Sequence, residues 1–95
     1  MTMNKQEFLT SAGLKVQTLE FWLEQRWLVP GQASAEMIFS DIDVARAHLI
    51  RDLKGDFGVN DEGVDIILHL VDQLHGLRGA FAQLQQDIQE RSRSR

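Results

Sequence analysis

The stretch that decides the fold is EFLTSAGLKVQTLEFWLEQRWLVP, residues 7–30. Its apolar residues recur at helical spacing in two short blocks, which predicts helices over Lys5–Ala12 and Val16–Gln25. Asn4 provides an N-cap for the first helix, and Gly13 ends it because glycine tolerates a positive φ. Two short helices joined by a few residues that include a glycine are typical of a helix-turn-helix.

Two short apolar runs after the second helix predict a small β-hairpin, the wing of a winged helix-turn-helix. The runs are Trp27–Val29 and Met37–Phe39, and a turn at Pro30-Gly31 follows the first of them. Proline has no backbone N–H, so we expect the first strand to lie at the edge of the sheet. Trp22 and Trp27 are expected in the core.

Two further helices complete a mainly all-α fold. A capping box at Ser40 and Asp43 predicts a third helix that ends near Lys54. The last helix begins near residue 60 and runs to about Glu90 without a proline. It would span roughly 45 Å, whereas a compact domain of this size has a radius of gyration of about 13 Å, so we expect it to project beyond the core. The predicted segments are a winged helix-turn-helix domain (1–58), a long C-terminal helix (59–90) and a disordered basic tail (91–95).

The last helix carries an apolar seam that a single helix in water cannot bury. Its residues recur every three or four positions, close to a heptad repeat, with one three-residue slip at Gly76. Two copies can bury this seam, so the sequence predicts a homodimer; the alternative is that the seam folds back on its own domain. The predicted dimer interface consists of Val64, Ile67, Val71, Leu74, Leu77, Phe81, Leu84 and Ile88.

The composition indicates a folded protein with an acidic surface. The 95 residues are 43% hydrophobic and 25% charged, as in globular domains. Fourteen acidic and ten basic side chains give a net charge of −4, and three of the arginines lie in the terminal RSRSR. Without that segment, fourteen acids face seven bases, a balance of −7 over residues 1–90. Such a surface favours a basic protein as a partner over nucleic acid.

The composition also excludes several kinds of site. The chain has no cysteine, so it has no disulfide, no thiolate zinc site and no cysteine nucleophile. No apolar run approaches the roughly 20 residues of a membrane span, and we expect no signal peptide. We therefore expect a soluble, cytoplasmic protein.

The histidines do not predict a metal or catalytic site. His69 and His75 flank Asp72 on one helix, but six residues of separation put their imidazoles roughly 120° apart around the helix axis. Asp65 and His69 provide two ligands at most, and His48 is expected at the surface. No Ser–His–Asp pattern, phosphate-binding loop or converging carboxylate pair stands out. We therefore expect a non-enzyme with no metal and no cofactor.

The outward side of the second helix lacks the cations that a DNA-binding helix needs. The wing from Gly31 to Glu36 also contains neither arginine nor lysine. Affinity for DNA comes from neutralised phosphates, and an acid about 4 Å from a phosphate costs on the order of 1 kcal/mol even in water. We therefore expect nucleic acid to be a poor partner. The outward side consists of Gln17, Glu20, Phe21, Glu24 and Gln25.

The same side is the first candidate surface for a protein partner. An outward aromatic beside acids is typical of a protein-contact anchor, so we assign Glu20, Phe21 and Glu24 to partner binding. The alternative for Phe21 is packing under the wing. Asp52 and Asp56, near the end of the third helix, are the second candidate, with a simply solvated face as the alternative.

Residues 7–30, followed after the wing by MIFSDIDVARAHLIRDLKGDFGV at residues 37–59, resemble the MerR-like winged-helix family. The resemblance covers about residues 5–60, and the long dimerisation helix belongs to the same pattern. Family members typically have a basic residue at the position of Glu20, a tyrosine at that of Phe21 and an arginine in the wing. The departures fall on positions that contact DNA in the family and spare the structural ones.

A narrower resemblance is to the chaperone-modulator branch of that family, CbpM. It is carried by Ile38-Phe39-Ser40-Asp41, by Leu49–Leu53, and by Phe57-Gly58-Val59 leading into Gly63–Leu68. Members of that branch bind the J domain of a DnaJ-like co-chaperone, CbpA, and inhibit its action with DnaK. The resemblance therefore implies a co-chaperone inhibitor. The alternatives are a MerR-type transcriptional regulator that reads DNA as a dimer, and a metal or small-molecule sensor.

Overall fold

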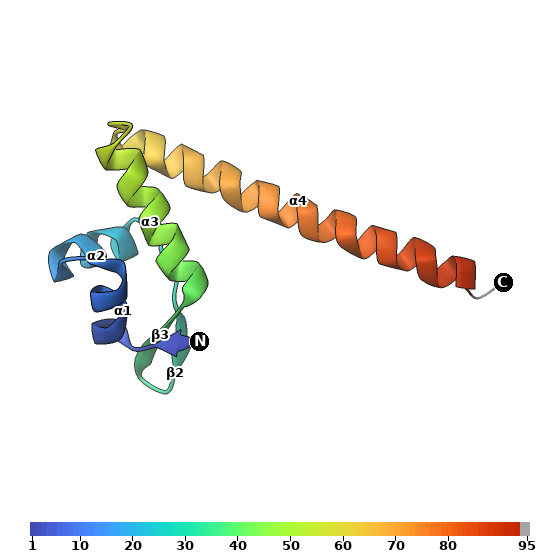
Figure 1. The fold of residues 1–95 in the computed structure, drawn as a ribbon, viewed down its shortest axis with the longest axis horizontal. Helices are drawn as coiled ribbons and strands as arrows, with labels where there is room; N and C mark the ends of the chain where they lie inside the picture. Colours follow the sequence, from blue (N-terminus) through green and yellow to red (C-terminus); the bar gives the residue numbers. More distant parts are fainter. Residues whose placement is uncertain (94–95) are drawn as a thin grey trace. The chain divides into compact units, whose positions relative to one another are not determined.

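The structure is a computed structural model that describes residues 1–93 of the chain (Figure 1). Four helices and three short strands make up this part, which confirms a mainly helical winged helix-turn-helix with a long C-terminal helix. The chain divides into two compact units, residues 1–65 and the residues from 66 onward. In chain order the elements are β1 (Thr2–Met3), α1 (Lys5–Ala12), α2 (Val16–Glu24), β2 (Gly31–Ala33), β3 (Glu36–Ser40), α3 (Asp41–Gly55) and α4 (Asp61–Arg93).

The helix-turn-helix is built by local capping, as the sequence predicts. The Glu7 N–H donates to Asn4 Oδ1 at 2.8 Å, and the Asn4 N–H donates to Glu7 Oε1 at 2.9 Å. Gly13 ends α1 with a left-handed φ of 68°. Arg51 of α3 donates from Nη1 to the Ala12 carbonyl at 2.6 Å, so the C-terminal end of α1 is tied to α3.

The wing begins later than predicted. The first strand of the hairpin, β2, starts at Gly31, and Trp27–Val29 is not a strand. The reason is a tight turn after α2: Arg26 has a left-handed φ of 60°, and the Trp27 N–H donates to the Trp22 carbonyl at 3.0 Å. This turn directs the first two apolar residues of the run into the core, so the hairpin forms from the residues that follow.

The sheet contains a third strand that the sequence does not predict. The strand order is β1-β3-β2, and β1 pairs antiparallel with β3 through Thr2 opposite Ser40 and Met3 opposite Phe39. A strand of two residues is too short to show an alternating pattern of apolar and polar residues. It nevertheless buries Met3 and ties the start of the chain to the wing.

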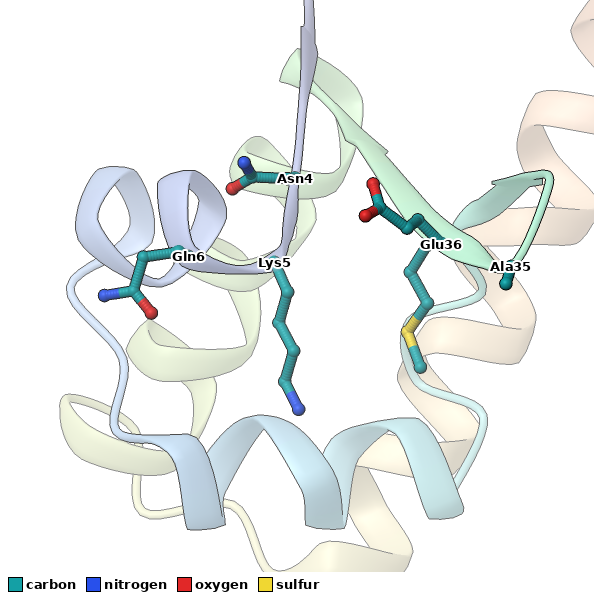
Figure 2. A pocket seen from close by; sticks show the side chains of 6 residues that line it. Asn4, Lys5, Gln6, Ala35 and Glu36 are labelled. Carbon is teal, nitrogen blue, oxygen red and sulfur yellow. The ribbon is translucent and has the colours of Figure 1, made fainter.

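A hollow of about 380 Å³ lies between the start of α1 and the wing turn (Figure 2). Lys5 extends from α1 toward α2, and its Nζ is 3.8 Å from Glu20 Oε1. The positive charge of Lys5 therefore adds to the outward face of α2, although Lys5 itself lies on α1. The lining residues are Asn4, Lys5, Gln6, Ala35, Glu36 and Met37.

The core of the N-terminal unit is held by aromatic contacts between elements far apart in the chain. Phe8 of α1 and Phe39 of β3 stack with ring centroids 4.2 Å apart, and both are fully buried. Trp22 and Trp27 are buried as predicted, and their ring centroids are 6.4 Å apart. The other buried apolar residues of this unit are Met3, Leu9, Ala12, Leu19, Leu28, Ala47, Ile50 and Val64.

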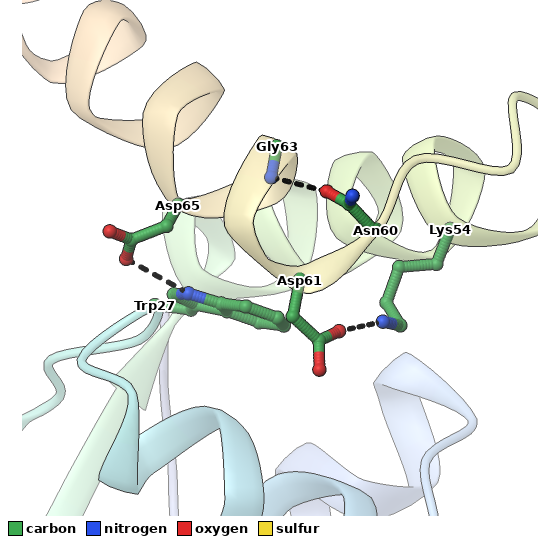
Figure 3. A network of polar contacts seen from close by, with 6 residues as sticks. All are labelled: Trp27, Lys54, Asn60, Asp61, Gly63 and Asp65. Atoms are coloured by element: carbon green, nitrogen blue, oxygen red, sulfur yellow. Dashed lines mark hydrogen bonds and ion pairs between the residues drawn. The ribbon is translucent and has the colours of Figure 1, made fainter.

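Trp27 connects α2 to both α3 and the first turn of α4 (Figure 3). Its indole Nε1 donates to Asp65 Oδ1 at 3.3 Å. Lys54 Nζ lies 5.6 Å from the indole centroid, a cation–π contact, and also pairs with Asp61. Arg46 of α3 donates from Nε to the Trp27 carbonyl. The indole and the backbone carbonyl of Trp27 thus make polar contacts with α3 and with the start of α4.

The start of α4 is closed by an asparagine cap. The Gly63 N–H donates to Asn60 Oδ1 at 2.7 Å, which satisfies one of the free N–H groups of the first turn (Figure 3). Val64, one turn into the helix, is fully buried. The first turn of α4 is therefore part of the N-terminal unit, which extends to Asp65, whereas the sequence placed the segment boundary at residue 58.

The last helix is longer than predicted and includes part of the expected disordered tail. α4 has 33 residues and ends at Arg93, so Arg91–Arg93 is helical. Arginine is a good helix former, and cations near a helix C-terminus interact favourably with the helix dipole. At 1.5 Å per residue the helix is about 50 Å long. The rest of the predicted tail, residues 94–95, lies outside the described residues.

We expect Gly63→Ala to lower the free energy of unfolding by about 1–3 kcal/mol, because a Cβ there overpacks the turn. It would lie 2.6 Å from Val59 Cγ1 and 3.1 Å from Asn60 Oδ1. The control is Gly79→Ala, where a Cβ meets no neighbour within 4 Å and should add about 0.5–1 kcal/mol of helix stability. Urea unfolding followed by circular dichroism measures both, and an equal gain in the two variants would contradict the packing described for Gly63.

Candidate functional site

The outward face of α2 is exposed, as the sequence predicts. Glu20, Phe21 and Glu24 all lie at the surface. The ion pair of Glu20 with Lys5 is solvated, since the two side chains are 62% and 41% exposed, and such a pair contributes little to stability. Gln17 and Gln25 flank these residues and are also exposed. The role of this face in partner binding stays a prediction.

Phe21 packs against the core and is only partly exposed to solvent. Its ring meets Trp27 edge-on, with centroids 5.7 Å apart and an interplanar angle of 84°. It is 37% exposed, so it is far from a fully displayed aromatic. Phe21 thus helps to cover the buried indole, a role that neither of the two interpretations from sequence included.

The basic side chains of the N-terminal unit are mostly engaged within the protein. Residues 1–65 contain eleven acidic and six basic side chains, a formal balance of −5. Four of the six bases have contacts described above, with a carboxylate or a backbone carbonyl, and the remaining two lie at the ends of α2. The four are Lys5, Arg46, Arg51 and Lys54, and the two are Lys15 and Arg26.

The second predicted acidic surface lies at the C-terminal end of α3. Asp52 and Asp56 are both exposed, in the last turn of α3 and directly after it. Because they are four residues apart, they share one side of the chain. Phe57, which follows them, is 73% exposed. The structure thus sets the two predicted acidic surfaces on different elements and adds an aromatic residue to the second.

The apolar seam of α4 is more regular than predicted. Val64 is fully buried in the N-terminal unit, so it is wrong as a residue of the dimer interface. Ile67 and Val71 are half-buried. From Leu70 onward the exposed large apolar residues follow spacings of 4, 3, 4, 3 and 4, a heptad repeat without a slip, and Ile66, also exposed, lies outside this repeat. The repeat consists of Leu70, Leu74, Leu77, Phe81, Leu84 and Ile88.

The series predicted from the sequence begins at Val64 and does not include Leu70. Counting from Val64 selects Val71 and then requires a three-residue slip at Gly76 to reach Leu77. With Leu70 in its place, Gly76 and Gly79 fall outside the seam. Leu70 is 56% exposed, and this exposure, which residue order does not reveal, places it in the seam. Pairing of two copies through this seam stays a prediction.

Residues 1–93 contain no group of three or more histidine or acidic side chains arranged to hold a metal ion. Gln73 lies 3.3 Å from His69, between Nε2 atoms, so that imidazole is placed beside an amide. Along the same described stretch, no helix has the length and apolar character that crossing a membrane requires.

Comparison with known families agrees with the geometry of the fold. The model of the MerR HTH family of regulatory proteins matches residues 3–86, which include the helix-turn-helix, the wing and most of α4. No curated protein sequence matches the chain significantly. Because the match covers most of the chain, the protein belongs to the MerR helix-turn-helix family of regulatory proteins.

Proposed function

We propose that this chain is a protein-binding member of its family: a co-chaperone modulator that binds the J domain of a DnaJ-like protein of the CbpA type and inhibits its activity with DnaK. The MerR-type regulatory domain points to a regulator rather than an enzyme. One observation carries the proposal. The face of α2 that would enter a DNA groove displays carboxylates, while three of the six cations of the unit are engaged away from this face and a fourth, Lys5, pairs with Glu20.

The charge arrangement is unfavourable for DNA. Glu20 and Glu24 project from the helix that a winged helix-turn-helix inserts into the major groove. Each carboxylate placed about 4 Å from a phosphate costs on the order of 1 kcal/mol instead of contributing a favourable contact. Lys15 and Arg26 flank the helix and Lys5 is engaged with Glu20, so this face supplies too few free cations for the phosphate contacts on which DNA affinity depends.

The same charge arrangement favours a basic protein surface. J domains present a basic helix, with which they dock DnaK, and the resemblance to the chaperone-modulator branch points to this partner. A unit with a balance of −5 attracts such a helix over a distance of about a Debye length, near 10 Å at 0.1 M salt. Opposite charges speed the encounter, and added salt weakens it.

We also propose that the active form is a homodimer that pairs through α4. Six exposed apolar residues in strict heptad spacing form a continuous stripe on this helix. Isolated helices gain little stability in water without a packed face, so residues 66–93 need a partner to stay helical. A second copy supplies an identical stripe, which makes it the simplest partner.

For the proposed partner, we expect titration calorimetry with a purified J domain of a DnaJ-like protein to show binding at tens of micromolar protein. Raising the salt from about 0.05 M to about 0.3 M should weaken it several-fold through screening. In parallel, the chain should reduce the J domain's stimulation of DnaK ATP hydrolysis. Absence of heat at both salt concentrations would reject this function.

For DNA, we expect no shift of genomic duplex fragments on gels at about 0.15 M salt. The charge-reversed variant Glu20→Lys, Glu24→Lys should gain on the order of tenfold in duplex affinity, because it restores cations to the recognition helix. A control variant with Asp52→Lys and Asp56→Lys carries the same charge change on α3. Tight duplex binding by the unaltered chain would favour the transcriptional regulator.

For the dimer, we expect Leu77→Glu with Leu84→Glu to give a monomer in light scattering coupled to size exclusion, together with a loss of helix signal. Burying two carboxylates at core heptad positions costs free energy, so two copies of the chain cannot pair through this seam. Ala82→Glu, at an exposed position outside the seam, should leave the mass of two chains unchanged. A dimeric double variant would contradict pairing through this seam.

A further inference from the structure

Phe57 is the most exposed aromatic side chain of the described chain. It lies between α3 and α4 and is 73% exposed, against 37% for Phe21. Phe21 also rests on Trp27, whereas no ring contact involves Phe57 in residues 1–93. An exposed phenylalanine costs hydrophobic free energy in the free protein and regains it when a partner covers the ring.

The backbone around Phe57 is held in one conformation by hydrogen bonds. The Phe57 and Asp56 N–H groups donate to the Asp52 carbonyl at 3.2 and 2.9 Å, and the Val59 N–H donates to the Leu53 carbonyl at 2.8 Å. Gly58 takes the left-handed φ of 62° that this helix end requires. The ring is therefore presented from a fixed turn, so little conformational entropy is lost when a partner binds it.

The carboxylates beside Phe57 have no neutralising partner. Asp52 and Asp56 are exposed, and no ion pair to either is found among residues 1–93. The three cations of α3 are engaged elsewhere: Arg46 with the Trp27 carbonyl, Arg51 with the Ala12 carbonyl and Lys54 with Asp61. We name this surface the α3 corner. It consists of Asp52, Asp56 and Phe57.

The acidic charge of the α2 face is more fully compensated by cations than that of the α3 corner. Glu20 is paired with Lys5, and Lys15 and Arg26 stand at the two ends of the helix. Its aromatic, Phe21, is mostly covered. The α3 corner thus combines the more exposed ring with the less compensated charge.

We infer that the basic helix of the J domain docks on the α3 corner, with Phe57 as the apolar anchor. This inference rests on the proposed function and names the surface that performs it. Lysine and arginine side chains of the partner cover the ring with their aliphatic stems, and their charged ends reach Asp52 and Asp56. Aromatic and arginine side chains are enriched in interface hot spots, where the surrounding contacts exclude water.

The test is titration calorimetry of the full chain with a purified J domain, using matched variants of the two surfaces. Phe57→Ser should weaken binding on the order of 30-fold, the loss typical of a hot-spot aromatic, and Phe21→Ser by less than about threefold. Asp52→Lys with Asp56→Lys should weaken it at least about tenfold and more than Glu20→Lys with Glu24→Lys. Unfolding midpoints from circular dichroism check that each variant is folded. If a phenylalanine variant does not fold, the comparison of the two charge-reversed variants decides which surface binds the J domain.

The reverse order of losses would overturn the α3 corner and leave the proposed function standing on the α2 face. Equal losses at the two surfaces would also overturn the inference. Failure of the unaltered chain to bind would instead reject the proposed function itself. A change of molecular mass by light scattering in Phe57→Ser would show that a second copy covers the ring, which also overturns the inference.

Discussion

The burial of Trp27 is the constraint on which the N-terminal unit depends. The indole is 1% exposed, and it packs against Trp22 and Phe21 of α2 while donating its N–H to Asp65. A buried indole N–H needs an acceptor, which ties the first turn of α4 to the tryptophan. Lys54, over the ring, is held by the same group of contacts. The turn after α2 places this side chain in the core, and its burial accompanies the late start of the wing and the attachment of the first turn of α4.

The same packing determines which charges face solvent. Arg46 binds the Trp27 carbonyl, Arg51 the end of α1, and Lys54 the start of α4, so three cations support the fold of this unit. The carboxylates nearby are left at the surface. In a family whose scaffold commonly binds DNA, this use of the cations supports a protein partner with a basic surface. It is also the reason that the α3 corner is less compensated than the α2 face.

Much of the candidate site was visible in the sequence, because helical periodicity places residues on faces. Glu20, Phe21 and Glu24 lie outward as expected, and so do Asp52 and Asp56. Phe57 was not identified, since a residue in a loop has no periodic neighbours that reveal its exposure. The contact of Phe21 with Trp27 cannot be predicted from the sequence either, because it joins a helix to a turn whose direction depends on the backbone conformation of Arg26.

Local interactions explain what the sequence specifies without help from the rest of the chain. The capping boxes at Asn4 and Ser40 and the glycine after α1 act between residues at most a few positions apart, so the two limits of α1 and the start of α3 follow directly from residue order. Long-range packing settles the remainder. Whether Val64 joins the core or the seam, whether Trp27 enters a strand, and which carboxylates keep a cation depend on contacts between distant segments, and those contacts exist only once the chain is folded.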